Sequence, residues 1–346
     1  MKENRNRTKI IFRVALIVFL AIAIVWIFIE QINKNSGSPN DNNKEVSTIE
    51  KQNKEDTQDQ KLNWVAPRET TIPTGESGNE IRYGREIIAH TALYLGPKGK
   101  VATISNGMNC QNCHNQAGTK SFGFNFSAVA ATYPQFRKRS ESWVSIAERI
   151  NSCFNRSLNG QSLDTTSKEM KAMIAYMKWL GKDVPNNLKP VNAGVVKLAY
   201  LDRAANPVKG KIVYATCQVC HGQDGQGHLN DTGTEYIFPP LWGKHSYNDG
   251  AGLYRLGNFA SFVKGNMPFG TTYKHPVLTD EEAWDVAAYV NSQPRPHKNQ
   301  SKDYSIIADK PIDFPFGPYA DNFSEIQHKF GPFEPILSAK KSIIEK

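Results

Sequence analysis

The chain has 346 residues, 39% of them hydrophobic and 22% charged, and its formal net charge at pH 7 is +9. On a prior of about 150 residues per domain this length excludes a single small domain and suggests two. Part of the positive charge is concentrated at the N-terminus, because five Lys and Arg residues lie among the first 13. We expect no nucleic-acid partner.

An apolar run follows these N-terminal cations. It extends from Val14 to Ile29, and with residues 10–12 it reaches about 20 residues if the side chain of Arg13 extends to the membrane interface. The positive flank places the N-terminus in the cytoplasm and the rest of the chain outside. We therefore expect residues 1–30 to be a transmembrane anchor and the protein to lie on the periplasmic side of the inner membrane. A cleaved signal peptide is the alternative, which the distant small-residue site Ser36-Gly-Ser38 disfavours.

Residues 31–62 are rich in Asn, Lys, Gln, Glu, Asp and Ser and contain few apolar residues. Such a composition cannot bury a core, so we predict a disordered linker. As a flexible coil it would span roughly 30 Å and let the rest of the chain stand off the membrane.

Residues 63–190 are predicted to form a first domain around one short motif. A helix is expected near residues 79–95, and Cys110-Gln-Asn-Cys113-His114 follows it. The pattern C-x-x-C-H is typical of covalent attachment of haem c. Its two thiols reach the two vinyl groups of one porphyrin, and the adjacent imidazole becomes the proximal iron ligand.

The fifth cysteine lies in a predicted helix of unusual composition. Arg149, Cys153 and Ser157 fall on one line of this helix, and a neighbouring line is apolar. Asn159-Gly160 is expected to end this helix, because Asn and Gly readily adopt the left-handed backbone conformation found at helix C-termini. A later helix is expected to begin at the capping-box pattern Thr166-x-x-Glu169 and to end before Gly181.

The sixth iron ligand of this first haem, haem 1, is predicted to be Cys153. A soft sulfur or an imidazole is the usual distal ligand, and Cys153 is the only such donor between His114 and Met170. The rivals are an upstream histidine and three methionines of the following helix, namely His90, Met170, Met173 and Met177.

Residues 191–298 repeat this plan as a second domain. They contain a second motif, Cys217-Gln-Val-Cys220-His221, and a closing helix that begins at Thr279-Asp-Glu-Glu282. Met267, between helix-breaking residues, is the expected distal ligand of haem 2, and the rivals are His228, His245 and His275. We expect a mainly α protein of two fused cytochrome c-type domains with long loops, and a C-terminal extension, residues 299–346, that wraps the surface.

Several segments resemble known families. Pro239-Pro-Leu-Trp-Gly243, Ser246-Tyr-Asn-Asp-Gly-Ala-Gly-Leu253 and Asn266-Met-Pro268 resemble class I cytochromes c. The stretch from about residue 63 to 296 is similar to diheme thiosulfate dehydrogenase of the TsdA type, and its first domain is similar to the haem–cysteinate domain of SoxA. The pattern Glu148-Arg-Ile-x-x-Cys153-Phe-x-Arg-Ser157-x-Asn-Gly160 matches the signature around the cysteine ligand.

The resemblance implies an enzyme that couples two thiosulfates into tetrathionate or runs in reverse, with chemistry at haem 1 and electron transfer through haem 2. It places the substrate residues at Arg139, Arg149 and Ser157, and the cysteine ligand at Cys153. Some members carry a lysine that exchanges with the loop methionine, but this chain has Asn266 there. Guanidinium groups also suit a small dianion such as thiosulfate on chemical grounds.

Three alternatives remain open at this point. Arg139 and Arg149 could instead pair with haem propionates. The protein could be a membrane-tethered diheme electron carrier without its own substrate, or a SoxA-like sulfur transferase. The enzyme hypothesis also requires a redox partner, which we expect to be a cytochrome or a quinol-linked electron carrier.

Overall fold

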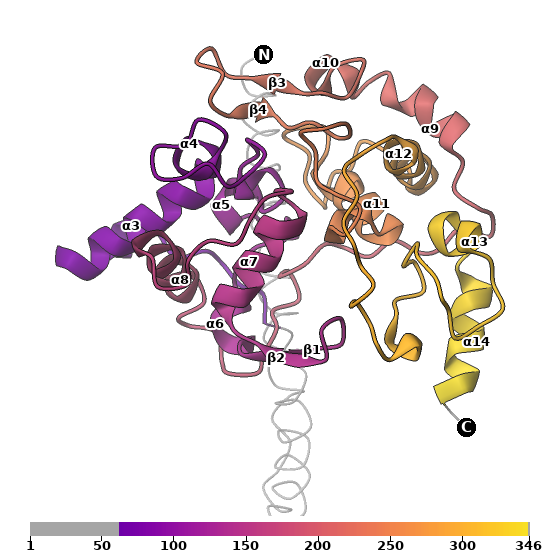
Figure 1. The fold of residues 1–346 in the computed structure, drawn as a ribbon, viewed down its shortest axis with the longest axis horizontal. Helices are drawn as coiled ribbons and strands as arrows, with labels where there is room; N and C mark the ends of the chain where they lie inside the picture. The colour runs from indigo at the N-terminus through magenta and orange to yellow at the C-terminus, as the bar shows by residue number, and fades with distance from the viewer. Residues whose placement is uncertain (1–61, 345–346) are drawn as a thin grey trace, which may run out of the picture. The chain divides into compact units, whose positions relative to one another are not determined.

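The computed structural model describes residues 62–344, which belong to one compact unit that contains both predicted haem domains (Figure 1). The predicted anchor and all but the last residue of the predicted linker lie outside the described residues. Within the described part of the chain, no helix combines the length and the apolar character needed to cross a membrane.

The first domain is built on a pair of packed helices, α3 (Gly75–Ala89) and α8 (Lys168–Leu180). A Cβ added at Gly84 would lie 1.9 Å from the carbonyl oxygen of Ala172, so only glycine permits this close crossing. The other elements are η1 (Glu69–Thr71), α4 (Thr91–Leu95), η2 (Cys110–Asn112), α5 (Asn115–Gly118), α6 (Val129–Thr132), the antiparallel strands β1 (Gln135–Arg137) and β2 (Ser142–Val144), and α7 (Ile146–Arg156).

Two expectations for this domain need correction. The helix expected over residues 79–95 is divided at His90 into α3 and α4. The cap of α8 is Ser167, whose hydroxyl accepts a hydrogen bond from the backbone N–H of Met170, whereas the Thr166 hydroxyl contacts Asp164. Neighbouring Ser and Thr residues compete for the same orphan N–H groups, and spacing alone does not decide between them.

The helix that carries Cys153 forms as predicted. Ser145 and Glu148 make a reciprocal capping box at the start of α7, and Ser157 is its C-cap. Ile150 and Phe154 are buried in the core of the first domain, so the neighbouring line with Arg149 and Cys153 faces the predicted site.

The second domain repeats the same helix pair, which supports the predicted duplication. α9 (Pro207–Tyr214) packs on α12 (Asp280–Ser292), and a Cβ at Gly210 would lie 1.9 Å from the carbonyl oxygen of Asp285. Thr279 and Glu282 form the predicted capping box of α12. The other elements are α10 (Gln218–His221), the antiparallel strands β3 (His228–Leu229) and β4 (Tyr236–Phe238), η3 (Gly252–Tyr254) and α11 (Leu256–Asn266).

The C-terminal extension contributes to the core as well as to the surface. It contains η4 (Ile307–Asp309), α13 (Glu325–Phe330) and α14 (Glu334–Ile344). Phe333 and Ile336 are buried within the core of the second domain. The sequence predicts that the extension wraps the surface. The extension does more than this, because some of its apolar residues are buried in the interior of the second domain.

Candidate functional site

The first C-x-x-C-H motif forms a tight turn that brings its thiols and its histidine together. The backbone N–H of His114 donates to the carbonyl oxygen of Cys110 over 2.9 Å. The Nδ1 atom of His114 lies 2.5 Å from the carbonyl oxygen of Phe124. A carbonyl can only accept, so Nδ1 carries the proton and Nε2 is left with its lone pair for a metal.

The second motif repeats this arrangement. The N–H of His221 donates to the carbonyl of Cys217 over 3.0 Å, and Nδ1 of His221 donates to the carbonyl of Pro239 over 2.8 Å. Each domain thus offers two thiols and one imidazole with its tautomer fixed by a backbone carbonyl. This donor set fits a covalently attached haem c in each domain.

Cys153 lies beside the histidine of the first motif. Its Sγ accepts a hydrogen bond from the Arg149 guanidinium over 2.8 Å. Burial alone would raise the pKa of Cys153, but the positive charge of Arg149, the largest opposing influence, helps to lower it to about 6. The sulfur is therefore held as a thiolate near neutral pH, the form that ligates metals.

The two other predicted substrate residues are placed differently. Ser157 is one turn beyond Cys153 and half-buried. Arg139 follows strand β1, and its guanidinium contacts the second domain and the extension: Gly250 O at 3.3 Å, Asp303 Oδ2 at 3.7 Å, and the ring of Tyr304. The structure brings Arg149 to Cys153 by direct contact, whereas Arg139 is held by partners from distant parts of the chain.

Asp303 is a residue that the sequence analysis missed. One of its oxygens accepts from Arg156 at 2.7 Å, and its side chain is 9% exposed. The backbone N–H of Tyr304 donates to the carbonyl of Arg139 over 2.8 Å. No motif marks Asp303, since the two arginines it contacts, Arg156 and Arg139, lie 147 and 164 residues away and only the fold brings them together.

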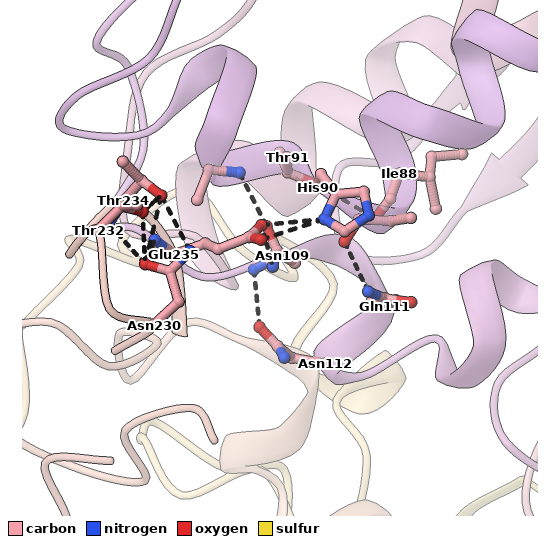
Figure 2. A network of polar contacts seen from close by, with 12 residues as sticks. Ile88, His90, Thr91, Asn109, Gln111, Asn112, Asn230, Thr232, Thr234 and Glu235 are labelled. Atoms are coloured by element: carbon pink, nitrogen blue, oxygen red, sulfur yellow. Dashed lines mark hydrogen bonds and ion pairs between the residues drawn. The ribbon is translucent and has the colours of Figure 1, made fainter. Parts of the chain in front are cut away.

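The rival ligands of haem 1 are engaged elsewhere. Met170, Met173 and Met177 are buried in the core of the first domain. Nδ1 of His90 lies 3.1 Å from a carboxylate oxygen of Glu235, to which the Asn109 amide also donates over 3.2 Å (Figure 2). These placements favour Cys153 over its rivals.

Glu235 also joins the two motifs. Asn109 immediately precedes Cys110, whereas Glu235 immediately precedes strand β4 of the second domain. At the other end of β4, Pro239 supplies the carbonyl that fixes His221. One short strand therefore connects the first attachment motif to the proximal histidine of the second.

Met267 is the C-cap of α11 and packs, partly buried, against the core of the second domain together with Cys217. Its neighbour Asn266 donates to the carbonyl of Phe122 over 3.0 Å and accepts from the Asn115 amide over 3.1 Å. The rivals His228, His245 and His275 are exposed. Their exposure favours Met267 as the ligand within this domain.

Comparisons with known proteins agree with this architecture. Residues 100–185 match the family model of the SoxA/TsdA cytochrome c domain, and residues 207–294 match that of cytochrome c. A thiosulfate dehydrogenase of Psychrobacter arcticus is 41% identical over 72% of this chain and 74% of its own length. One from Allochromatium vinosum is 37% identical over 67% of this chain and 84% of its own.

A solved structure is similar as well. The as-isolated form of thiosulfate dehydrogenase TsdBA from Marichromatium purpuratum superimposes with a TM-score of 0.64 at 29% identity. The match covers 78% of this chain and 54% of that one, so this chain corresponds to about half of the TsdBA chain.

Proposed function

The chain belongs to the thiosulfate dehydrogenase family, and we propose on that basis that it joins two thiosulfates into tetrathionate or catalyses the reverse reaction. In the forward direction one S–S bond forms and two electrons leave: 2 S₂O₃²⁻ gives S₄O₆²⁻ and 2 e⁻. No proton is gained or lost. The residues must therefore bind anions and keep like charges close together.

Two covalently bound haem c groups are the cofactors. Cys110 and Cys113 would hold haem 1 and Cys217 and Cys220 would hold haem 2, and the imidazoles of His114 and His221 would bind the irons. Cys153 and Met267 are the proposed distal ligands. When bound, the two haems would supply electron transfer, haem 1 beside the substrate residues and haem 2 for exchange with an external partner.

The contact of Arg149 with Cys153, within reach of His114, carries this proposal. The guanidinium holds the sulfur as a thiolate and adds positive charge where two dianions must meet. Ser157, one turn away, offers a further hydrogen-bond donor. A protein that only carried electrons would not need a cationic anion-binding group at its distal ligand.

The decisive experiment uses the purified full-length chain under anaerobic conditions. Thiosulfate should reduce its haems and tetrathionate should reoxidise them, as followed by the optical haem bands, with tetrathionate quantified as the product. Sulfate serves as a control anion of similar charge. If neither sulfur compound changes the haem spectra, the chain is an electron carrier rather than this enzyme.

We also propose that the protein lies on the periplasmic side of the inner membrane through its N-terminal segment. The basic flank followed by an apolar run supports this placement. A cytochrome or a quinol-linked carrier is the proposed redox partner. Retention of the full chain in alkali-washed membranes, and its release after removal of residues 1–30, would test the anchor.

Replacing Arg139 with alanine should raise KM for thiosulfate and lower kcat with both haems attached. Loss of one charge-assisted hydrogen bond costs about 1.5–3 kcal/mol, equivalent to roughly 10- to 150-fold in kcat/KM. Steady-state kinetics at low salt measure the effect. Lys138→Ala is the matched control, because Lys138 is an exposed neighbour that pairs with Asp309. Unchanged kinetics in Arg139→Ala would assign this arginine to the domain interface alone.

Replacing Met267 with glycine should leave both haems attached and lower the midpoint potential of haem 2. Thioether ligation favours the reduced iron, so its loss favours the oxidised state. Spectroelectrochemical titration without substrate measures both potentials. Met177→Leu, in the core of the first domain, controls for loss of a buried methionine. An unaltered potential for haem 2 would exclude Met267 as its ligand.

A further inference from the structure

A cleft of about 780 Å³ lies between the two haem domains. Its lining side chains include Asn106 and Asn159 from the first domain and Lys244, His245 and Arg295 from the second, and no carboxylate is among the described residues that line it. The Asn106 amide donates to the carbonyl of Ser246 over 3.0 Å, which fixes the two walls relative to each other. A cleft that is lined by positively charged side chains and by no carboxylates favours an anionic occupant.

Arg295, just beyond α12, is the unusual member of this group. Its Nη2 donates to the carbonyl of Val290 over 2.7 Å, whereas Nε and Nη1 are buried and have no hydrogen-bond partner in the described part of the chain. The guanidinium lies over the rings of Tyr247, at 4.3 Å, and Tyr254, at 5.2 Å. Burying a guanidinium with two unpaired donors is costly, so an anionic acceptor from outside the protein would stabilise this arrangement.

Arg295 lies next to the segment that carries haem 1. Arg295 stacks on Tyr247, whose neighbour Ser246 accepts a hydrogen bond from the Asn106 amide. Asn106 lies four residues before Cys110. On the other side of Tyr247, Asn248 donates to the carbonyl of Asn155 in α7 over 2.9 Å. The second domain therefore inserts residues 246–248 between the first attachment motif and the helix of Cys153.

We propose that Arg295 binds a propionate carboxylate of haem 1, so that the second domain completes the binding site of the first domain's cofactor. Nε and Nη1 lie on different edges of the guanidinium, and each can donate a charge-assisted hydrogen bond to a carboxylate oxygen. Arg139 and Arg149, the arginines first considered for this role, already contact Asp303 and Cys153. The proposal rests on the cofactor and is independent of the substrate.

A free sulfur oxyanion that enters from the cleft would offer Arg295 the same kind of oxygen acceptor as a haem propionate. One variant distinguishes these two anions. Arg295→Gln in the full chain should lower the midpoint potential of haem 1 in the absence of any sulfur compound, because an unpaired carboxylate stabilises ferric iron. The potential of haem 2 should stay constant. Arg203→Gln is the matched control, because Arg203 is paired with Asp285 and Glu281.

If the haem 1 potential is unchanged and KM for thiosulfate is raised, Arg295 binds the free oxyanion and not the propionate. If the potential and KM both stay at wild-type values while both haems are attached, Arg295 binds no anion and the proposal is wrong. Should Arg295→Gln fail to accumulate, Arg295→His keeps a cation at low pH. Its haem 1 potential should then fall as the imidazole deprotonates, and a pH response equal to that of the wild type would contradict the proposal.

Discussion

Replacing Cys153 with methionine should abolish thiosulfate oxidation while both haems remain attached. Cys153 accepts a hydrogen bond from Arg149, and its lowered pKa, about 6, keeps it a thiolate near neutral pH. A thioether is neutral, so haem 1 should gain a clearly higher midpoint potential and lose the sulfur chemistry at its distal side. The fold should survive, because methionine adapts to irregular space. Turnover assays and redox titration measure these two effects.

Electron paramagnetic resonance adds a test that does not depend on turnover. The oxidised wild type should show a low-spin signal of the thiolate type, which Cys153→Met and Cys153→Gly should both lack. Ser152→Ala, on the adjacent position of α7, is the control for disturbance of the helix. A fully active Cys153 variant, or a wild type without the thiolate signal, would leave the electron-carrier hypothesis as the better one.

Replacing Arg149 with alanine should have the second-largest effect. The change removes a donor to the substrate, with an expected loss of roughly 10- to 150-fold in kcat/KM for a charge-assisted hydrogen bond of about 1.5–3 kcal/mol. It also removes the positive charge that lowers the pKa of Cys153, so the pKa of this thiol should rise. Steady-state kinetics, together with the thiolate signal, measure the two contributions.

Arg137→Ala is a suitable control for Arg149→Ala, since Arg137 lies on the β1 strand and bonds Gln135. Arg149→Lys should restore part of kcat/KM, because lysine keeps the charge but loses the planar fork. Wild-type kinetics in Arg149→Ala would show that this arginine serves the cysteine ligand without contacting the substrate.

Much of this architecture could be predicted from local patterns. The two C-x-x-C-H motifs, the capping box of α12 and the apolar line of α7 are each encoded within a dozen residues. The repeated motifs also predicted the duplicated domains, and the helix pairs around Gly84 and Gly210 agree with that prediction. Short-range patterns of this kind reflect backbone and packing rules that hold wherever the segment lies.

The remainder depends on contacts between distant segments. Glu235 meets His90 across 145 residues, and Asp303 meets Arg156 across 147. Arg295 has no distinguishing neighbours in the sequence, and its importance emerges only from two buried donors, Nε and Nη1, that find no acceptor among residues 62–344. Such roles follow from topology, because a single sequence gives no measure of which surface residues the fold will bring together.

Strand β4 has a consequence for how turnover should respond to the solvent. Because the strand is bonded toward Asn109 at one end and toward His221 at the other, a hinge motion that separated the two attachment motifs would have to break these hydrogen bonds. An electron that crosses between the domains would meet the same separation in every cycle. Turnover at saturating substrate should therefore be insensitive to viscosity when sucrose or glycerol is added. A rate that falls in proportion to viscosity would reveal a domain motion that the bonded strand does not prevent.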